Sequence, residues 1–137
     1  MGAELTRREV VVELARVPTL AVEVAAAAAT AGVPEGRLPF VELAVEEVLA
    51  NICRHAYHGR PGPVQLALLQ EGRQLTIQIA DEGPAFDPTA APVRSAREPL
   101  DERAAGGWGL ELIREAVDEL GYRRERRRNV VSLVYHV

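Results

Sequence analysis

Three polar side chains follow one another at four-residue intervals in the stretch VEEVLANICRHAY, residues 45–57: Glu47, Asn51 and His55. In a helix, residues four apart lie on the same flank, and here that flank borders an apolar stripe. A glutamate can take a proton from a hydroxyl group or a water. The amide oxygen of asparagine is a ligand that Mg²⁺ uses beside phosphate oxygens. Such groups suffice for phosphoryl transfer, in which a protein mainly positions groups and neutralises charge.

A second candidate is Asp81, which opens the stretch DEGPAFDP. By the two-residue period of a strand, it lies on the same face as Leu75, Ile77 and Ile79. A carboxylate at the core-facing end of a strand is costly unless something binds it. It can accept a hydrogen bond from an exocyclic amine such as that of adenine, while Gly83 lets a ligand come close. The alternative is an Asx-turn over Gly83.

A third candidate is the glycine-rich start of GGWGLELIREAVDELG, residues 106–121. Glycines directly before a helix let backbone N–H groups approach an anion, and the helix N-terminus adds a favourable partial charge. A turn that merely begins a helix explains the same letters.

The other polar residues have structural alternatives. Asn51 could hydrogen-bond a neighbouring turn, and Trp108 could anchor a lid or the core. Cys53, His55 and His58 invite a metal site, but Cys53 points about 160° away from His55 around the helix, which disfavours it.

The elements that must position these residues follow from periodicity and from turn residues. A strand over 9–15 would bury Val10, Val12 and Leu14, and the last helix would bury Leu110, Ile113, Val117 and Leu120. The expected order is a strand at 9–15, a helix ending at Gly32, a helix from Pro34 or Pro39 to Tyr57, strands at 63–70 and 74–81, a long connection over 82–105, a helix at 106–121, and strands at 122–128 and 129–137. This order predicts a single α+β domain over 1–137, a two-layer α/β sandwich whose mixed, mostly antiparallel sheet is covered on one face by helices.

Composition excludes several classes of function. The 137-residue chain has a net charge of -4, which argues against direct nucleic-acid binding, and the run RRERRR at 123–128 is typical of a solvated strand or loop edge. All 16 basic residues are arginine, which excludes the P-loop, the lysine of ordinary protein kinases and Schiff-base enzymes. A single cysteine and the lack of a run of ~20 apolar residues favour a cytoplasmic protein without membrane contact.

In order and spacing, three motifs resemble the ATP-binding domain shared by DNA gyrase, MutL, heat-shock chaperone ATPases and histidine kinases. They are ELAVEEVLANICRHAY, DEGPAFDP and GGWGLELIREAVDEL. The chain is most similar to the small bacterial anti-sigma factor serine/threonine kinases, and the resemblance covers nearly all of it. The resemblance implies a Bergerat-type ATP-binding fold with ATP and Mg²⁺ as cofactors.

Carried over by position, the resemblance implies that Asn51 coordinates magnesium and that Glu47 is the general base. Asp81 would bind the adenine amino group, and Gly83 would let the base sit close.

The remaining positions would hold the phosphates. Gly107 and Gly109, with the backbone of Trp108 and Leu110, would contact them, and 88–105 would form a short lid. Two departures from the family pattern stand at Ala85, where glycine is common, and at Ala104 and Ala105, where a basic residue is common. Arg103 or Arg97 would then reach the phosphate instead.

The function implied is an ATP-dependent serine/threonine kinase that acts as an anti-sigma factor. It would phosphorylate a serine of an anti-anti-sigma protein, sequester a sigma factor and form a homodimer through its first strand. One alternative is a nucleotide-sensing regulatory module without kinase activity. Another is a detached histidine-kinase ATPase domain, which the short lid and the lack of a preceding phosphoacceptor helix hairpin disfavour.

Overall fold

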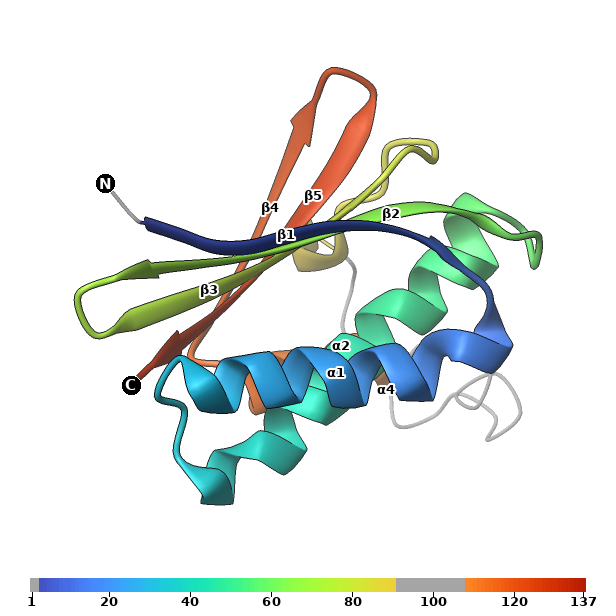
Figure 1. Cartoon of the computed structure of the whole chain (residues 1–137). Coiled ribbons are helices and arrows are strands. Elements are labelled where there is room, and N and C mark those ends of the chain that lie inside the picture. The colour runs from blue at the N-terminus through green and yellow to red at the C-terminus, as the bar shows by residue number, and fades with distance from the viewer. Residues whose placement is uncertain (1–2, 91–107) are drawn as a thin grey trace, which may run out of the picture.

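The computed structural model describes residues 3–90 and 108–137, and at 90 and 108–110 it describes the backbone alone (Figure 1). Within these described residues, five strands and three α-helices follow one another in the predicted order. They are β1 (Ala3–Val12), α1 (Val17–Thr30), α2 (Leu38–Asn51), β2 (Gly62–Glu71), β3 (Gln74–Asp81), α4 (Trp108–Ala116), β4 (Glu119–Glu125) and β5 (Arg128–His136). Single turns of 3₁₀ helix precede α1 and α2, at Leu14–Arg16 and Glu35–Arg37, and another lies at Pro88–Ala90.

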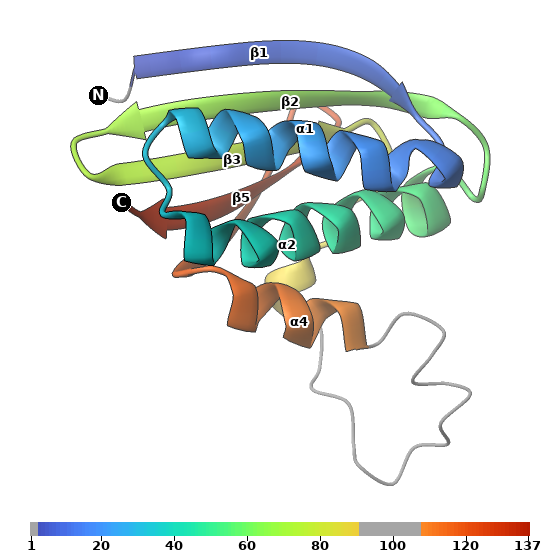
Figure 2. The ribbon, with the colours of Figure 1, turned by 60° about the horizontal axis from the view of Figure 1, so that its bottom comes forward.

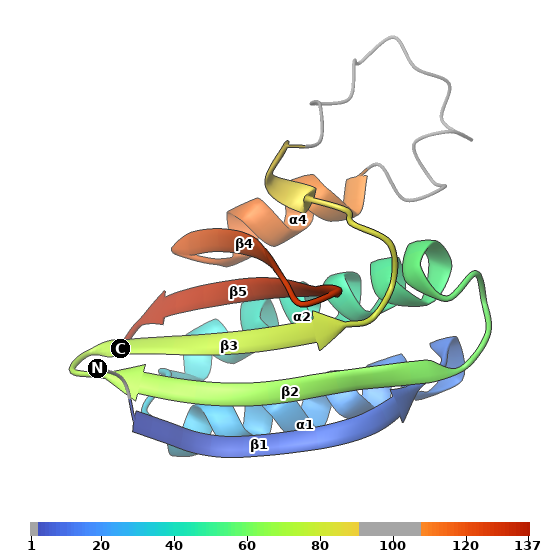
Figure 3. The same ribbon diagram turned by 90° about the horizontal axis from the view of Figure 1, so that it is seen from above.

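The strands form one sheet in the order β1-β2-β3-β5-β4, and all four neighbouring pairs are antiparallel. The helices cover one face of it, with α2 between α1 and α4 (Figure 2). Seen from the other side, no helix lies in front of the sheet (Figure 3). The two-layer α+β prediction is confirmed, and the described sheet contains no parallel pair.

The core lies between the two layers. Alternate residues of the central strands, such as Leu66, Ile77 and Leu133, are almost fully buried against the helices. Each such side chain contributes roughly 1.5–3 kcal/mol when it leaves water. In α1 the small residues Ala21 and Ala28 are completely buried, so this alanine-rich helix packs closely on its neighbours.

Several predicted boundaries are wrong, and two of the differences change what an apolar residue contacts. The first strand ends at Val12 and begins as early as Ala3, whereas Leu14 lies in a 3₁₀ turn and is 48% exposed. The helix predicted to reach Gly121 ends at Ala116, and Leu120 packs against the core from β4. Pairing with β5 explains the second change, because a strand here gains a full ladder of backbone hydrogen bonds.

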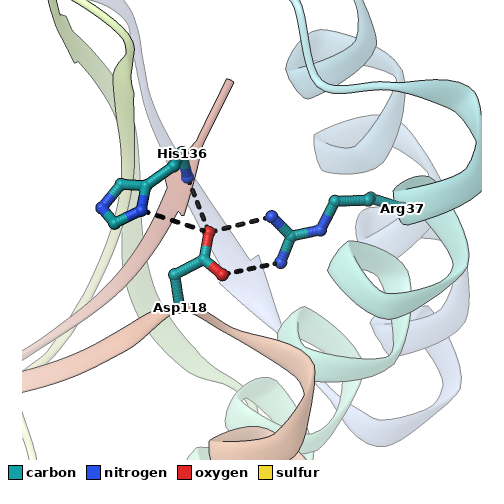
Figure 4. A network of polar contacts seen from close by, with 3 residues as sticks. All are labelled: Arg37, Asp118 and His136. Atoms are coloured by element: carbon teal, nitrogen blue, oxygen red, sulfur yellow. Dashed lines mark hydrogen bonds and ion pairs between the residues drawn. The ribbon is translucent and has the colours of Figure 1, made fainter.

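A polar network fixes the turn between α4 and β4 (Figure 4). The carboxylate of Asp118 accepts two hydrogen bonds from the Arg37 guanidinium, at 2.8 and 3.1 Å, and one from the backbone N–H of His136 at 2.7 Å. The Arg37 guanidinium also lies 5.3 Å from the ring centre of Tyr135. The network therefore ties the helix layer to the sheet at the end of β3 opposite Asp81.

Among residues 3–90 and 108–137, no helix combines the length and the hydropathy that a bilayer span requires.

Candidate functional site

A mainly apolar pocket of about 480 Å³ opens between the end of α2, the sheet and the segment after β3. A mainly apolar cleft with a few polar groups is typical of a small-molecule site. Its polar lining residues are Asn51, His55, Asp81 and Asn129, and its apolar ones are Val48, Ile52, Ala56, Pro84, Phe86, Pro88, Ile113, Leu120 and Val131. Two of the predicted site residues, Asn51 and Asp81, are thus brought together from different elements.

Asp81 ends β3 on the core-facing side, as predicted, and is 4% exposed. Its Oδ1 accepts hydrogen bonds from the Gly83 N–H at 2.8 Å and from Asn129 Nδ2 at 3.0 Å. The first contact is the Asx-turn that the sequence left open as an alternative. Within the described part of the chain Oδ2 has no hydrogen bond, so one carboxylate oxygen is available to a ligand in the pocket.

Asn129 is the residue that the sequence reasoning missed. It faces Asp81 across the β3–β5 ladder and is 3% exposed. Besides its bond to Asp81, its Nδ2 donates to the Pro84 carbonyl at 2.8 Å. Its Oδ1 accepts from the Phe86 N–H at 3.1 Å and the Tyr122 hydroxyl at 2.6 Å. One side chain therefore orients both the carboxylate and the turn that follows it. The available signal was an asparagine on the apolar face of a strand.

Asn51 is the last residue of α2, and its side chain is buried beside the pocket. Its Oδ1 has no hydrogen-bond partner in the described part of the structure. An unpaired buried carbonyl oxygen costs about 1–3 kcal/mol. A cation or a polar ligand group in the pocket would remove that cost, so the donor type and the burial fit a magnesium ligand.

Directly after Asn51 the helix widens into one π-turn, Ile52–Ala56. Such turns often occur at functional sites. Here the turn interrupts the regular four-residue spacing that placed His55 in line with Glu47 and Asn51. His55 instead reaches the mouth of the pocket, where its ring stacks on Phe86 with centroids 5.5 Å apart. Cys53 points into the core and is 1% exposed.

Glu47 lies one turn before Asn51 and is half-buried. It is outside the residues that line the pocket, and within the described chain it makes no hydrogen bond or ion pair. Its carboxylate is therefore uncommitted in the described part of the chain. The assignment of Glu47 as a base stays a prediction.

A glycine is required at position 83 because the chain there packs directly against the π-turn at Ala56. A Cβ at this position would lie 2.4 Å from the Cβ of Ala56 and 2.7 Å from its Cα. The turn after β3 therefore packs directly on the π-turn. Tyr57 strengthens this contact, because its hydroxyl accepts from the Glu82 N–H at 2.9 Å and donates to the Pro63 carbonyl. The predicted close approach of an adenine ring to Gly83 stays a prediction.

Two arginines hold the wall of the pocket from outside. Arg124, in the run that was read as a solvated edge, donates to the Gly83 carbonyl at 2.7 Å. Arg114 of α4 donates to the Thr89 carbonyl at 2.9 Å. The predicted edge is exposed, but one of its members also supports the site.

Several predicted contacts are not tested by this geometry. Ala85 is exposed and does not line the pocket. Trp108, Gly109 and Leu110 form the first turn of α4, of which the backbone alone is described. The other predicted positions, which are Arg97, Arg103, Ala104, Ala105, Gly107 and the lid from 91 to 105, lie outside the described residues.

Comparison with known proteins decides the family. Residues 10–135 match the family described as the histidine kinase-like ATPase domain. The chain belongs to this family.

Two relatives show which members of the family this histidine kinase-like ATPase domain is similar to. The serine/threonine-protein kinase BtrW of Bordetella bronchiseptica is 38% identical over 102 residues, which are 73% of this chain and 72% of that protein. The anti-sigma F factor of Clostridium acetobutylicum is 28% identical over 90 residues, 63% of this chain and 60% of that protein. The predicted resemblance to anti-sigma factor kinases is confirmed at the level of the family.

Membership gives the pocket a ligand class, because the family is defined by an ATPase domain. The histidine kinase-like ATPase domain described here offers an apolar cavity with one available carboxylate oxygen, which suits the adenine of ATP.

Proposed function

We propose that the chain is a magnesium- and ATP-dependent protein serine/threonine kinase of the anti-sigma factor type. The observation that carries the proposal is the buried, unpartnered Oδ1 of Asn51 beside the available oxygen of Asp81 in one pocket of an ATPase-family domain. The similarity to the kinase BtrW supports the choice of reaction.

Each described residue then has a task. Asp81 accepts a hydrogen bond from the adenine amino group, while Asn129 and Gly83 N–H hold its other oxygen. Asn51 supplies the amide oxygen that binds magnesium. When bound, magnesium neutralises the charge of the phosphates.

Glu47 acts as the general base. It takes the proton of a serine hydroxyl on the substrate as that oxygen forms a bond to the γ-phosphorus of ATP, and ADP leaves with the electrons of the broken P–O bond. A general base must lie close to the nucleotide, and its carboxylate must not already be occupied by a hydrogen bond or ion pair. Glu47 lies one helical turn from Asn51 and has no such partner in the described part of the chain.

The proposed partners are a sigma factor and an anti-anti-sigma protein, the latter as the substrate, in the cytoplasm. Two relatives named anti-sigma F factors support this choice. The proposed homodimer forms through β1, an edge strand of ten residues with a row of unpaired backbone groups on one side. Its Leu5 and Val11 are 44% and 53% exposed, as a strand that pairs with a second copy requires.

Kinetics of two variants test the catalytic assignment. Glu47→Gln is expected to lower phosphotransfer from labelled ATP to an anti-anti-sigma protein at least about 100-fold, with ATP affinity nearly unchanged. Asn51→Ala is expected to abolish the magnesium-dependent part of ATP binding, measured by calorimetry with and without EDTA. Glu46→Gln removes a neighbouring, equally half-buried carboxylate and serves as the matched control. Undiminished transfer by Glu47→Gln would eliminate this residue as the base.

A second candidate is a nucleotide-sensing module that regulates its partner without phosphorylating it. The position of Glu47 outside the pocket lining favours it. This candidate predicts that ATP raises the melting temperature while no label reaches any partner retained from the native cytosol. The kinase proposal predicts the same rise in melting temperature and, in addition, transfer of the label to the partner.

A further inference from the structure

Figure 3 looks onto the face of the sheet that no described helix covers. A second hollow lies on this face. Its volume is about 430 Å³. It is lined from all five strands of the described sheet by Arg7, Gln65, Ala67, Gln78, Ala80, Arg123, Glu125, Arg128 and Val130. We call these residues the open-face hollow.

Small residues make this part of the sheet concave. Ala67, Ala80 and Val130 form the floor and are 2%, 7% and 6% exposed although they face away from the core. Longer side chains stand around them. This combination of a low floor and a raised rim makes a hollow in the sheet face.

The rim is rich in hydrogen-bond donors. Arg7 and Arg128 both donate to the single Oε1 of Gln65, at 2.6 and 3.3 Å. Arg123 donates through Nε to Glu125 at 2.7 Å. These bonds leave terminal nitrogens of Arg123 and Arg128 without a partner in the described part of the chain.

The charge of the hollow is positive on an otherwise acidic protein. Arg7 is paired with Glu4 beside the hollow, and Arg123 is paired with Glu125. The third arginine, Arg128, therefore leaves one formal positive charge here, whereas the whole chain carries -4. Guanidinium groups bind phosphate oxygens through paired hydrogen bonds. A second copy of this face would bring like charges together, and a single hollow is too small a basic surface for nucleic acid.

We propose that the open-face hollow binds a small phosphorylated molecule through its phosphate group. Arg123 and Arg128 supply the charge-assisted hydrogen bonds, and the amides of Gln65 and Gln78 offer further donors.

This site lies back to back with the nucleotide pocket. Strand alternation places Ala80 and Arg128 in the hollow and their neighbours Asp81 and Asn129 in the pocket. The proposal is independent of kinase activity. Its test must distinguish phosphate bound in the open-face hollow from phosphate bound in the pocket beside Asp81.

The test is an NMR titration of the full chain with inorganic phosphate, phosphoserine and malonate. We expect saturable shifts of the Ala67, Ala80 and Val130 amides with the two phosphates. Arg123→Gln and Arg128→Gln are each expected to weaken this binding about tenfold or more. The Arg123 side chain is exposed and that of Arg128 is half-buried, and neither belongs to the core, so the fold should persist.

Arg8→Gln is the matched control, because it removes the same charge from β1 at a position outside the hollow, paired with Glu23 at 3.6 Å. It should bind as the original protein does. Whether phosphoserine or inorganic phosphate binds more tightly identifies the source of the phosphate group. Equal affinity for malonate, or shifts that survive both arginine changes, would overturn the proposal.

Discussion

At the scale of single residues, Gly83 shows that a glycine in a sequence motif can be required by packing. In this chain the turn after β3 touches the π-turn so closely that a methyl group would overlap Ala56. Gly83→Ala is therefore expected to lower the free energy of unfolding by about 1–3 kcal/mol, measured by urea denaturation. The reason is steric, so the loss should occur without any nucleotide.

A double-mutant cycle separates the steric cause from others. Ala56→Gly in the Gly83→Ala background should restore part of the lost stability, since it removes the Cβ that the new methyl meets. Gly36→Ala, at a position where an added Cβ meets no atom within 4 Å, should have little effect. Full stability of Gly83→Ala alone would mean that the contact is not as tight as described.

The sequence could identify the site residues that carry a distinct chemical anomaly. Asp81 was an acid on an apolar strand face and Asn51 an amide within a helix, and both lie at the pocket. Asn129 escaped because its role depends on the β3–β5 register, which brings residues 48 positions apart into contact. The hydrogen bond from Arg124 to the Gly83 carbonyl could not be predicted for the same reason, because an arginine run does not indicate which of its members turns toward the protein.

At the scale of elements, helix and strand types were predictable from periodicity, and their ends were not. Helix α4 ends at Ala116 because the chain from Glu119 pairs with β5, and the Asp118 carboxylate fixes the turn between them by binding the His136 N–H and the side chain of Arg37. Neither partner is near in sequence. Likewise, the π-turn after α2 packs against the turn at Gly83, and a hydrophobic pattern does not encode this contact.

The Asp118 network gives a prediction in pH. Hydrogen bonds from Arg37, and next from the His136 N–H, lower the pKa of Asp118 below its ordinary value. The unfolded chain therefore binds this proton more readily, and the stabilisation is complete above the unfolded pKa of about 3.9. It is lost as the pH falls through the lower pKa of the folded state.

Asp118→Asn should accordingly lower the free energy of unfolding by about 1 kcal/mol at pH 7. The difference from the original protein should shrink as the pH falls below about 4, as measured by urea denaturation at several pH values. Glu119→Gln, which changes the next residue, an exposed glutamate, should show no such trend. A difference that stays constant down to pH 2.5 would contradict the role of the carboxylate charge.

At the scale of the whole molecule, one continuous core joins the nucleotide pocket to the far end of the sheet. Ile113 and Val131 line the pocket, and they belong to the same buried cluster as Leu75 and Tyr135 beside the Arg37 network. This is why a coarse pattern of elements was enough to predict the architecture: few arrangements bury these faces together. It also predicts that the domain unfolds as a unit.

Hydrogen exchange with and without ATP tests whether the domain unfolds as one cooperative unit. At about 100 times its Kd, magnesium-ATP should add about 2.7 kcal/mol to the free energy of unfolding, since it binds the folded state alone. The Leu75 and Tyr135 amides pair at the end of the sheet remote from Asp81. If the core is one unit, hydrogen exchange at these amides should slow by the full factor of about 100 on adding nucleotide. Asp81→Asn, which removes the proposed adenine acceptor, should abolish the effect. Slowing confined to amides around Asp81 would mean that the pocket end opens separately from the rest of the domain.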